Sequence, residues 1–182
     1  FNSKDLCMVD KIPDLIDAGI DSFKVEGRMK TNLYVAVTAR TYREAIDDYY
    51  ESPELHESKL DHYREEIAAC TMRDFTKGFY YGKPSYEDQI YENNTYIRNA
   101  VYLGTVEEVV VDEIIIHQKN KFSVGDEIEV MLFDGTNKKV KVQSIIDEYG
   151  NSMESAPHPK QELRLALSDI GGISEGMILR MQ

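Results

Sequence analysis

A glutamate and an arginine separated by one glycine, Glu26-Gly27-Arg28, follow a short run whose composition is typical of a buried strand. A glutamate at the end of a strand can act as a general base or bind a substrate hydroxyl. An arginine can hold a carboxylate or a phosphate with its planar fork, and the glycine permits close approach of a ligand. Glu26 and Arg28 are therefore candidate catalytic residues for an anionic substrate. The alternative is that they form a structural ion pair.

A cysteine near the start of the chain is a candidate cofactor-binding residue. Cys7 lies close to Lys4, and a thiolate beside a cation can be a metal ligand or a redox-active group. The alternative is a thiol packed in the core, since free cysteine is among the most buried residue types. The four histidines lack the spacing of metal ligands, so no metal site is predicted. Two cysteines are too few for a disulfide framework, which favours a reducing cytoplasm.

Lysines in the C-terminal half are candidate RNA-binding residues: Lys119, Lys121, Lys138 and Lys139. Lys141 and three aromatic residues, Tyr102, Phe122 and Phe133, lie in the same half of the sequence, and such a mixture can neutralise phosphates and stack on bases. Lysines are also typical of the solvent-facing side of an alternating strand, which is the alternative. The formal net charge of −12 argues against a nucleic-acid footprint over the whole surface. Any RNA site is therefore expected to be local.

The 182-residue chain is 42% hydrophobic and long enough for one large domain or two small ones. Its apolar runs are short, such as residues 109–111 and 114–116, and are far below the roughly 20 residues that span a bilayer. We therefore expect no membrane partner and a cytoplasmic location. The sequence opens without methionine or a leader peptide, inside what reads as a structured region. This predicts the C-terminal part of a longer protein.

The elements expected to position Glu26 and Arg28 are a short helix and a strand. Pro13 suits the first turn of a helix over residues 14–18, and a strand over residues 22–25 follows a tight turn. This order is typical of the last repeat unit of an α/β (TIM-like) barrel. In such a barrel the carboxyl ends of the strands form the reaction face. Glu26 and Arg28 would then lie at its rim.

Residues 32–69 carry the spacing of helices. One apolar face is predicted from residues that recur at intervals of four and three: Val35, Ala39, Tyr42, Ile46 and Tyr49. Pro53 ends this helix, and a second helix is expected over residues 57–70. The two would form a helical hairpin. The surplus of Asp and Glu in this stretch is interpreted as a solvated face.

From residue 99 onward, turn signals recur about every ten residues and separate β-rich runs. Six strands are predicted, over residues 101–111, 113–117, 127–132, 138–146, 162–167 and 177–181. Closure into a small antiparallel barrel would remove the exposed edges of such short strands. The expected fold is α+β, in three parts: the end of the α/β barrel with its hairpin (1–71), a linker (72–98) and the closed β-barrel (99–182).

Several longer stretches resemble one known family. "NSKDLC" and "LIDAGIDSFKVEGRMKTNLYVAVTARTYREAID" look like the end of the catalytic region of peptidase family U32, the collagenase-like proteases. "DFTKGFYYG", "NKFSVGDEIEVM" and "APHPKQELRLAL" are similar to that family's linker and C-terminal β-barrel. The resemblance implies relatives that hydroxylate tRNA wobble uridine, ribosomal RNA or ubiquinone precursors. It also implies an iron–sulfur cluster in some full-length members, held by cysteines upstream of this chain; no cofactor is expected within the chain itself.

Three functions remain open from the sequence. The chain is expected to be the C-terminal portion of an RNA-modifying enzyme, with the β-barrel docking tRNA or another substrate. The first alternative is a peptidase that acts on collagen-like or other peptides, whose catalytic groups would lie upstream. The second is a non-catalytic adaptor whose barrel binds a protein. On any of these the chain alone is expected to be inactive, and its oligomeric state is open.

Overall fold

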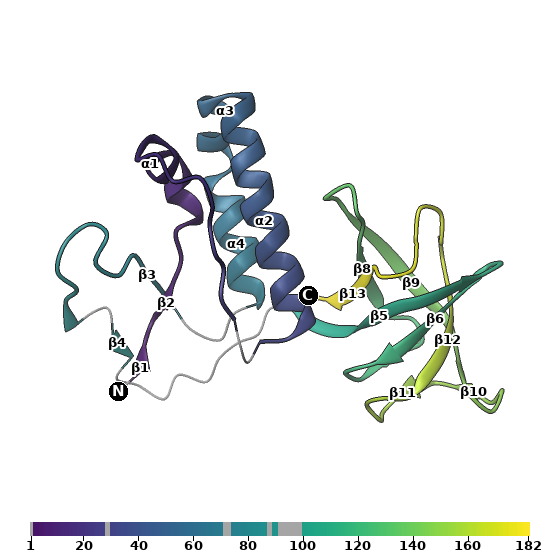
Figure 1. Cartoon of the computed structure of the whole chain (residues 1–182). Helices are drawn as coiled ribbons and strands as arrows, with labels where there is room; N and C mark the ends of the chain where they lie inside the picture. The colour runs from purple at the N-terminus through teal and green to yellow at the C-terminus, as the bar shows by residue number, and fades with distance from the viewer. Residues whose placement is uncertain (1, 28–29, 71–73, 87–88, 91–99) are drawn as a thin grey trace. The chain divides into compact units, whose positions relative to one another are not determined.

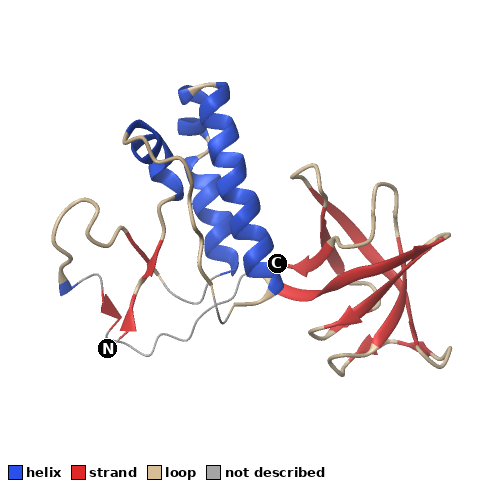
Figure 2. Cartoon of the chain, in the orientation of Figure 1, coloured by secondary structure: helices blue, strands red, loops and turns tan. Residues whose placement is uncertain are grey.

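The structure, a computed structural model, describes residues 2–27, 30–70, 74–86, 89–90 and 100–182. It divides into two compact units, Phe1–Asn99 and Ala100–Gln182, and each is treated by itself below. Figure 2 shows that the first unit holds the helices and the second is built from strands. Among the described residues, no helix has both the length and the apolar character needed to cross a membrane.

The second unit is a closed, six-stranded antiparallel barrel, as the sequence predicts. Its strands are β5 (Val101–Val110), β6 (Glu113–Gln118), β8 (Glu127–Met131), β9 (Asn137–Asp147), β12 (Glu162–Leu167) and β13 (Ile178–Met181). They are ordered β9, β12, β6, β5, β13, β8, and pairing of β8 with β9 closes the ring (Figure 1). Every strand therefore has a hydrogen-bonded neighbour on both sides.

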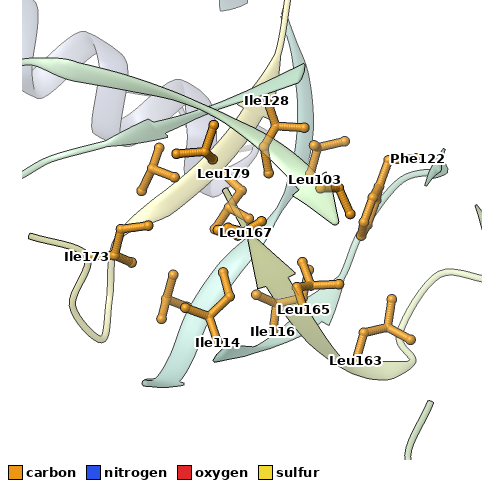
Figure 3. Close-up of a cluster of buried hydrophobic side chains, with 14 of the residues drawn as sticks. Leu103, Ile114, Ile116, Phe122, Ile128, Leu163, Leu165, Leu167, Ile173 and Leu179 are labelled. Atoms are coloured by element: carbon orange, nitrogen blue, oxygen red, sulfur yellow. The ribbon is translucent and has the colours of Figure 1, made fainter. Parts of the chain in front are cut away.

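Alternation of side chains builds the core of the barrel. Along β12, Leu163, Leu165 and Leu167 are buried, while Glu162 and Arg164 are exposed. The strands on both sides contribute large aliphatic side chains in the same way. Figure 3 shows these side chains pointing toward one another from all around the barrel. Because the interior is filled by side chains, this barrel is a packed core and not a ligand cavity.

Short pairings complete the second unit. Strand β10 (Ser152–Met153) adds to the outer edge of β9, and β7 (Phe122–Ser123) pairs with β11 (Ser155–Ala156). The β7–β11 pair places Phe122 against the end of the core, where it is 2% exposed. Of the three aromatic residues that the sequence suggested for RNA stacking, Phe122 and Tyr102 are therefore buried, whereas Phe133 is 72% exposed.

Gly104 in β5 has no room for a side chain. A Cβ atom at this position would lie 2.8 Å from the backbone carbonyl oxygen of His117 in the neighbouring strand β6. We expect Gly104→Ala to lower the barrel's free energy of unfolding by about 1 kcal/mol, because the strands must move apart. Urea unfolding checks this, with the exposed Gln143→Ala in β9 as the control. Equal stability of the two variants would contradict the expected strain.

Helices dominate the first unit. They are the 3-10 helix η1 (Val9–Lys11), α1 (Ile12–Asp17), α2 (Asn32–Glu51), α3 (Pro53–Ser58) and α4 (Leu60–Cys70). Thr31 begins α2 by accepting a hydrogen bond from the backbone N–H of Tyr34, and Ser52 caps α3 in the same way. Helices α2 and α4 pack side by side, which confirms the predicted hairpin (Figure 1).

The predicted buried face of α2 is wrong by a rotation of the helix. The residues that are buried are Leu33, Val37, Thr38, Thr41, Ala45 and Asp48. Val35, which the spacing placed inside, is 56% exposed. Asp48 also departs from the predicted solvated acidic face, because Lys59 pairs with it at 2.8 Å and the Tyr63 hydroxyl donates to it at 2.5 Å. A partnered carboxylate can be buried, which composition alone does not reveal.

The strand predicted over residues 22–25 is absent. This segment is irregular and Val25 is 48% exposed. A strand of a parallel barrel needs hydrogen-bonded neighbours on both sides, and no described segment pairs with this one. The predicted α/β-barrel unit is therefore not formed by the described residues. The small sheets of this unit lie elsewhere, with β2 (Asp5–Leu6) parallel to β3 (Phe75–Thr76) and β1 (Asn2–Ser3) antiparallel to β4 (Gln89–Ile90).

Candidate functional site

A cavity of about 500 Å³ lies within the first unit. Its walls come from β2 and the residues after it, the irregular segment that follows α1, the first half of α2, and β3. This volume is in the range of small-molecule sites. Glu26 and Cys7 both line it, so the structure brings together two residues that the sequence singled out separately.

Cys7 and Tyr42 form the buried wall of this cavity. Cys7 is 5% exposed, and the Tyr42 hydroxyl donates to its Sγ across 4.0 Å. The same hydroxyl accepts a hydrogen bond of 2.9 Å from the backbone N–H of Met8. Burial, together with the neighbouring Cys7, raises the pKa of Tyr42 well above its ordinary value of 10.0. Tyr42 is therefore a neutral hydroxyl at neutral pH, and the buried thiol faces a hydrogen-bond donor.

Charged side chains line other parts of the cavity. Lys30 Nζ lies 3.0 Å from Asp5 Oδ2 and 4.9 Å from the centre of the Tyr34 ring. The Glu26 side chain is 63% exposed, and its carboxylate lies 3.5 Å from Lys24 Nζ. The cavity thus offers a lysine, a carboxylate pair and a shielded thiol. Such a set can hold a small polar ligand that carries negative charge.

Packing within the protein, and not only the approach of a ligand, explains why a glycine stands at position 27. A Cβ atom there would lie 2.8 Å from Cε1 of Tyr34 and 3.0 Å from Cγ of Lys30. The close neighbour is therefore the protein's own α2 and the turn before it. Arg28 lies outside the described residues, so its role as the partner of Glu26 stays a prediction.

A charge cluster on the other side of Cys7 was not anticipated from the sequence. The Asp10 side chain is 6% exposed and pairs with Lys77 and with Arg64, the latter at 2.9 Å. Lys77 Nζ also donates to the Cys7 carbonyl at 2.8 Å. These residues line a second cavity of about 350 Å³. They are 54 and 67 positions apart along the chain, so no local pattern could have connected them.

The electrostatics of this cluster favour a charged Asp10. Burial raises its pKa, but hydrogen bonds and attraction from Lys77 and Arg64 outweigh burial and leave the pKa below the ordinary 3.8. The cluster therefore ties η1, α4 and the segment after β3 together through one ionised carboxylate.

The four candidate RNA-binding lysines of the barrel do not form one free patch. Lys138 Nζ donates to the Gly171 carbonyl at 2.6 Å and pairs with Asp169 at 2.7 Å. Lys139 lies 3.7 Å from Glu127. Lys119 and Lys121, beyond the end of β6, are exposed. Within residues 100–182 there are eight basic and fourteen acidic residues, so the two exposed lysines are a small local exception.

Metal ligands are not grouped in the described part of the chain. No three His, Cys, Asp or Glu side chains there are placed to hold a metal ion. An iron–sulfur cluster takes about four cysteine ligands, and the chain has two cysteines, Cys7 and Cys70. The residues of this chain by themselves therefore do not fit a cluster.

Two family models match the chain in succession. The model described as "Peptidase family U32" matches residues 1–90, and that of the "Peptidase family U32 C-terminal domain" matches residues 98–180. Together they cover both units of the structure.

Named relatives align over most of the chain. "tRNA hydroxylation protein P1" of Bacillus subtilis is 35% identical over 92% of this chain and 40% of its own length. "tRNA hydroxylation protein P" of Escherichia coli is 32% identical over 86% of this chain and 34% of its own. "Collagenase" of Porphyromonas gingivalis is 30% identical over 71% of this chain and 32% of its own length. The chain thus spans about two fifths or less of the length of these relatives.

One solved structure is similar to part of this chain. The crystal structure of the C-terminal domain of a U32 peptidase from Geobacillus thermoleovorans covers 44% of this chain and 91% of its own, with 24% identity and a TM-score of 0.41.

Proposed function

Because the chain belongs to peptidase family U32, we propose that it is the C-terminal part of a protein that takes part in tRNA hydroxylation. The observation that carries this proposal is the 35% identity to a tRNA hydroxylation protein over 92% of the chain, which includes both units. The activity belongs to the whole protein, of which this chain matches a minor part. With a tRNA substrate, we expect the protein to act in the cytoplasm.

Within that protein, the cavity of the first unit would contact the substrate or a small anionic co-substrate. Lys30 supplies a cation for a carboxylate or phosphate, and Glu26 supplies a hydrogen-bond acceptor at a more exposed position. Cys7 would serve as a shielded thiol beside Tyr42, and as at most one ligand of an iron–sulfur cluster in the full-length protein.

The barrel would act as a docking module for RNA. Its interior is packed, so a ligand must bind its outer surface. Lys119 and Lys121 are the exposed candidates, whereas Lys138 and Lys139 are engaged with acidic neighbours. Docking through the barrel therefore rests on a small surface next to the end of β6.

Peptide hydrolysis is a second candidate, supported by the 30% identity to a collagenase. That relative aligns with 71% of the chain, compared with 92% for the tRNA hydroxylation protein.

Nucleoside mass spectrometry of tRNA tests the proposal. Cells with and without the full-length gene are compared for hydroxylated uridine. We expect the modified nucleoside to disappear with the gene and to return when the gene is restored. An unchanged nucleoside profile, combined with cleavage of collagen-like peptides by the purified full-length protein, would favour the second candidate instead.

Substitutions at the candidate catalytic residues should affect the reaction itself. In the full-length protein we expect Glu26→Gln or Arg28→Lys to reduce the initial rate of hydroxylation about tenfold, since each removes a charge-assisted or forked hydrogen bond to the substrate. The exposed Glu57→Gln in α3 is the matched control, with an unchanged rate. Full activity in both variants would leave Glu26 and Arg28 with a structural role only.

A further inference from the structure

A short segment after β3 exposes three aromatic rings in succession. In the aromatic loop, defined as residues 78–84, Phe79 is 80% exposed, Tyr80 59% and Tyr81 56%. Burial of an aromatic ring is strongly favourable, so adjacent rings left in solvent are informative. Tyr80 lines the cavity that Glu26 and Cys7 share, and Tyr81 lines a separate hollow, so the loop offers aromatic rings to a flat or apolar ligand at more than one place.

The loop has a defined backbone. The N–H of Gly78 donates to Thr76 Oγ1 at 3.0 Å, and the N–H of Tyr80 donates to the Lys77 carbonyl at 3.3 Å. Gly82 has a φ of +137°, a backbone conformation that residues with a side chain rarely adopt. The rings are therefore exposed on a hydrogen-bonded turn and not on an unstructured segment.

Tyr81 is fixed at its hydroxyl and approached by a cation. Its hydroxyl donates to the Asp14 carboxylate, and Lys11 Nζ lies 5.3 Å from its ring centre. A ring held in place loses little side-chain entropy when a ligand stacks on it. Tyr81 is thus a preorganised platform.

A hollow of about 340 Å³ lies against this platform, lined by Tyr81, Phe75 and Pro84 and by two lysines, Lys77 and Lys83. Asp10 neutralises part of the charge of Lys77, but it is itself shared with Arg64. Lys83 is exposed, and no ion pair is recorded for it among the described residues. In a chain with a net charge of −12, an aromatic hollow with two lysines is a local site for an anion that carries a flat group.

We propose that the aromatic loop binds unpaired nucleotides of RNA, with a base stacked on Tyr81 in the hollow, a phosphate beside Lys83, and the exposed Phe79 of the same loop available to a neighbouring base. Stacking platforms flanked by cations are how proteins bind single strands without base-specific hydrogen bonds. The inference deepens the proposed function and rests on it in one respect: the bound RNA would be the tRNA substrate. It differs from the barrel lysines, because it places an RNA contact in the first unit, next to the cavity that Cys7 lines.

Binding of a fluorescein-labelled single-stranded octauridylate to the full chain tests the proposal by anisotropy. We expect Tyr81→Ala and Phe79→Ala to weaken binding at least about fivefold. Tyr81→Phe, which keeps the ring, should change it by less than about twofold. Tyr149→Ala and Tyr50→Ala remove tyrosines elsewhere that are more exposed than Tyr81, and both should bind as the parent chain does. Circular dichroism confirms that each variant is folded.

Salt dependence separates stacking from charge. Lys83→Ala should reduce the slope of log K against log salt by about 0.7, the value for one phosphate contact on a single strand. Unchanged affinity in both Tyr81→Ala and Phe79→Ala would overturn the proposal. So would binding of the loop to phosphatidylserine vesicles in the absence of any RNA binding.

The outcomes for the loop and for the proposed function are distinguishable. If the loop variants lose RNA binding while cells without the gene keep their hydroxylated uridine, the loop is an RNA site and the tRNA hydroxylation proposal fails. If hydroxylation requires the gene but Tyr81→Ala and Phe79→Ala bind RNA normally, the loop inference alone fails.

Discussion

Replacing Leu165 by alanine is expected to lower the barrel's free energy of unfolding by about 3 kcal/mol. Leu165 lies in the middle of β12 with none of its surface exposed. Ile114 of β6 and Ile145 of β9 are its partners in register on the two sides. Six strands hydrogen-bonded in a ring cannot collapse readily onto the space that the lost side chain leaves, so most of the cavity remains.

Hydrogen exchange in increasing urea measures this effect on peptides from residues 100–182, separately from the first unit. The neighbouring Arg164→Ala is the control, since its side chain is half exposed and lies 3.6 Å from Glu113; a change within about 0.5 kcal/mol is expected. If Leu165→Ala cost no more than Arg164→Ala, the interior of the barrel would not be the packed core described above.

Asp10→Asn is expected to lower the free energy of unfolding of the first unit by about 2 kcal/mol. The substitution leaves Lys77 and Arg64 without their shared carboxylate, and both cations are partly exposed, which limits the loss. Lys77 also donates a hydrogen bond to the Cys7 carbonyl and directly precedes the aromatic loop.

The same ion pairs predict a pH dependence. The folded pKa of Asp10 is below its ordinary value of 3.8, so its contribution to stability is complete well above pH 3.8 and is lost as the pH falls through the folded pKa. Between about pH 5 and pH 2 the parent chain should lose more stability than Asp10→Asn does. Thermal unfolding across this range checks the difference, with the exposed Asp61→Asn as the control. Parallel pH profiles would show that Asp10 is not the carboxylate involved.

Hydrophobic alternation and turn residues are local signals, and they predicted the barrel strand by strand. The sequence predicted a strand over residues 162–167, and β12 spans Glu162–Leu167. The sequence also predicted that the barrel is closed, because six short strands in an open sheet would leave two edges exposed. The predicted strand over residues 22–25 failed for the converse reason. Its composition suits a strand, but strand formation depends on neighbours that composition does not supply.

The site depended on contacts between distant residues. Glu26 and Cys7 were candidates by residue type, yet only the structure shows them lining one cavity with Tyr42, which lies 35 positions from Cys7. The buried face of α2 was missed because Thr38, Thr41 and Asp48 find partners or packing that a count of apolar residues ignores. The sequence shows that the aromatic loop contains three adjacent aromatic residues, but only the structure shows that their rings are exposed.

By itself, the sequence determined the family, the barrel and the helical hairpin, since these follow from motifs, periodicity and turns that are read along the chain. The tertiary structure decided the Asp10 cluster, the cavity beside Cys7 and the exposed platform of Tyr81. Each of these arises where segments tens of residues apart meet and settle which side chains share a charge, a hydrogen bond or access to solvent. Such proximity is a property of the packed chain, because local propensity carries no information about which distant segment becomes the neighbour.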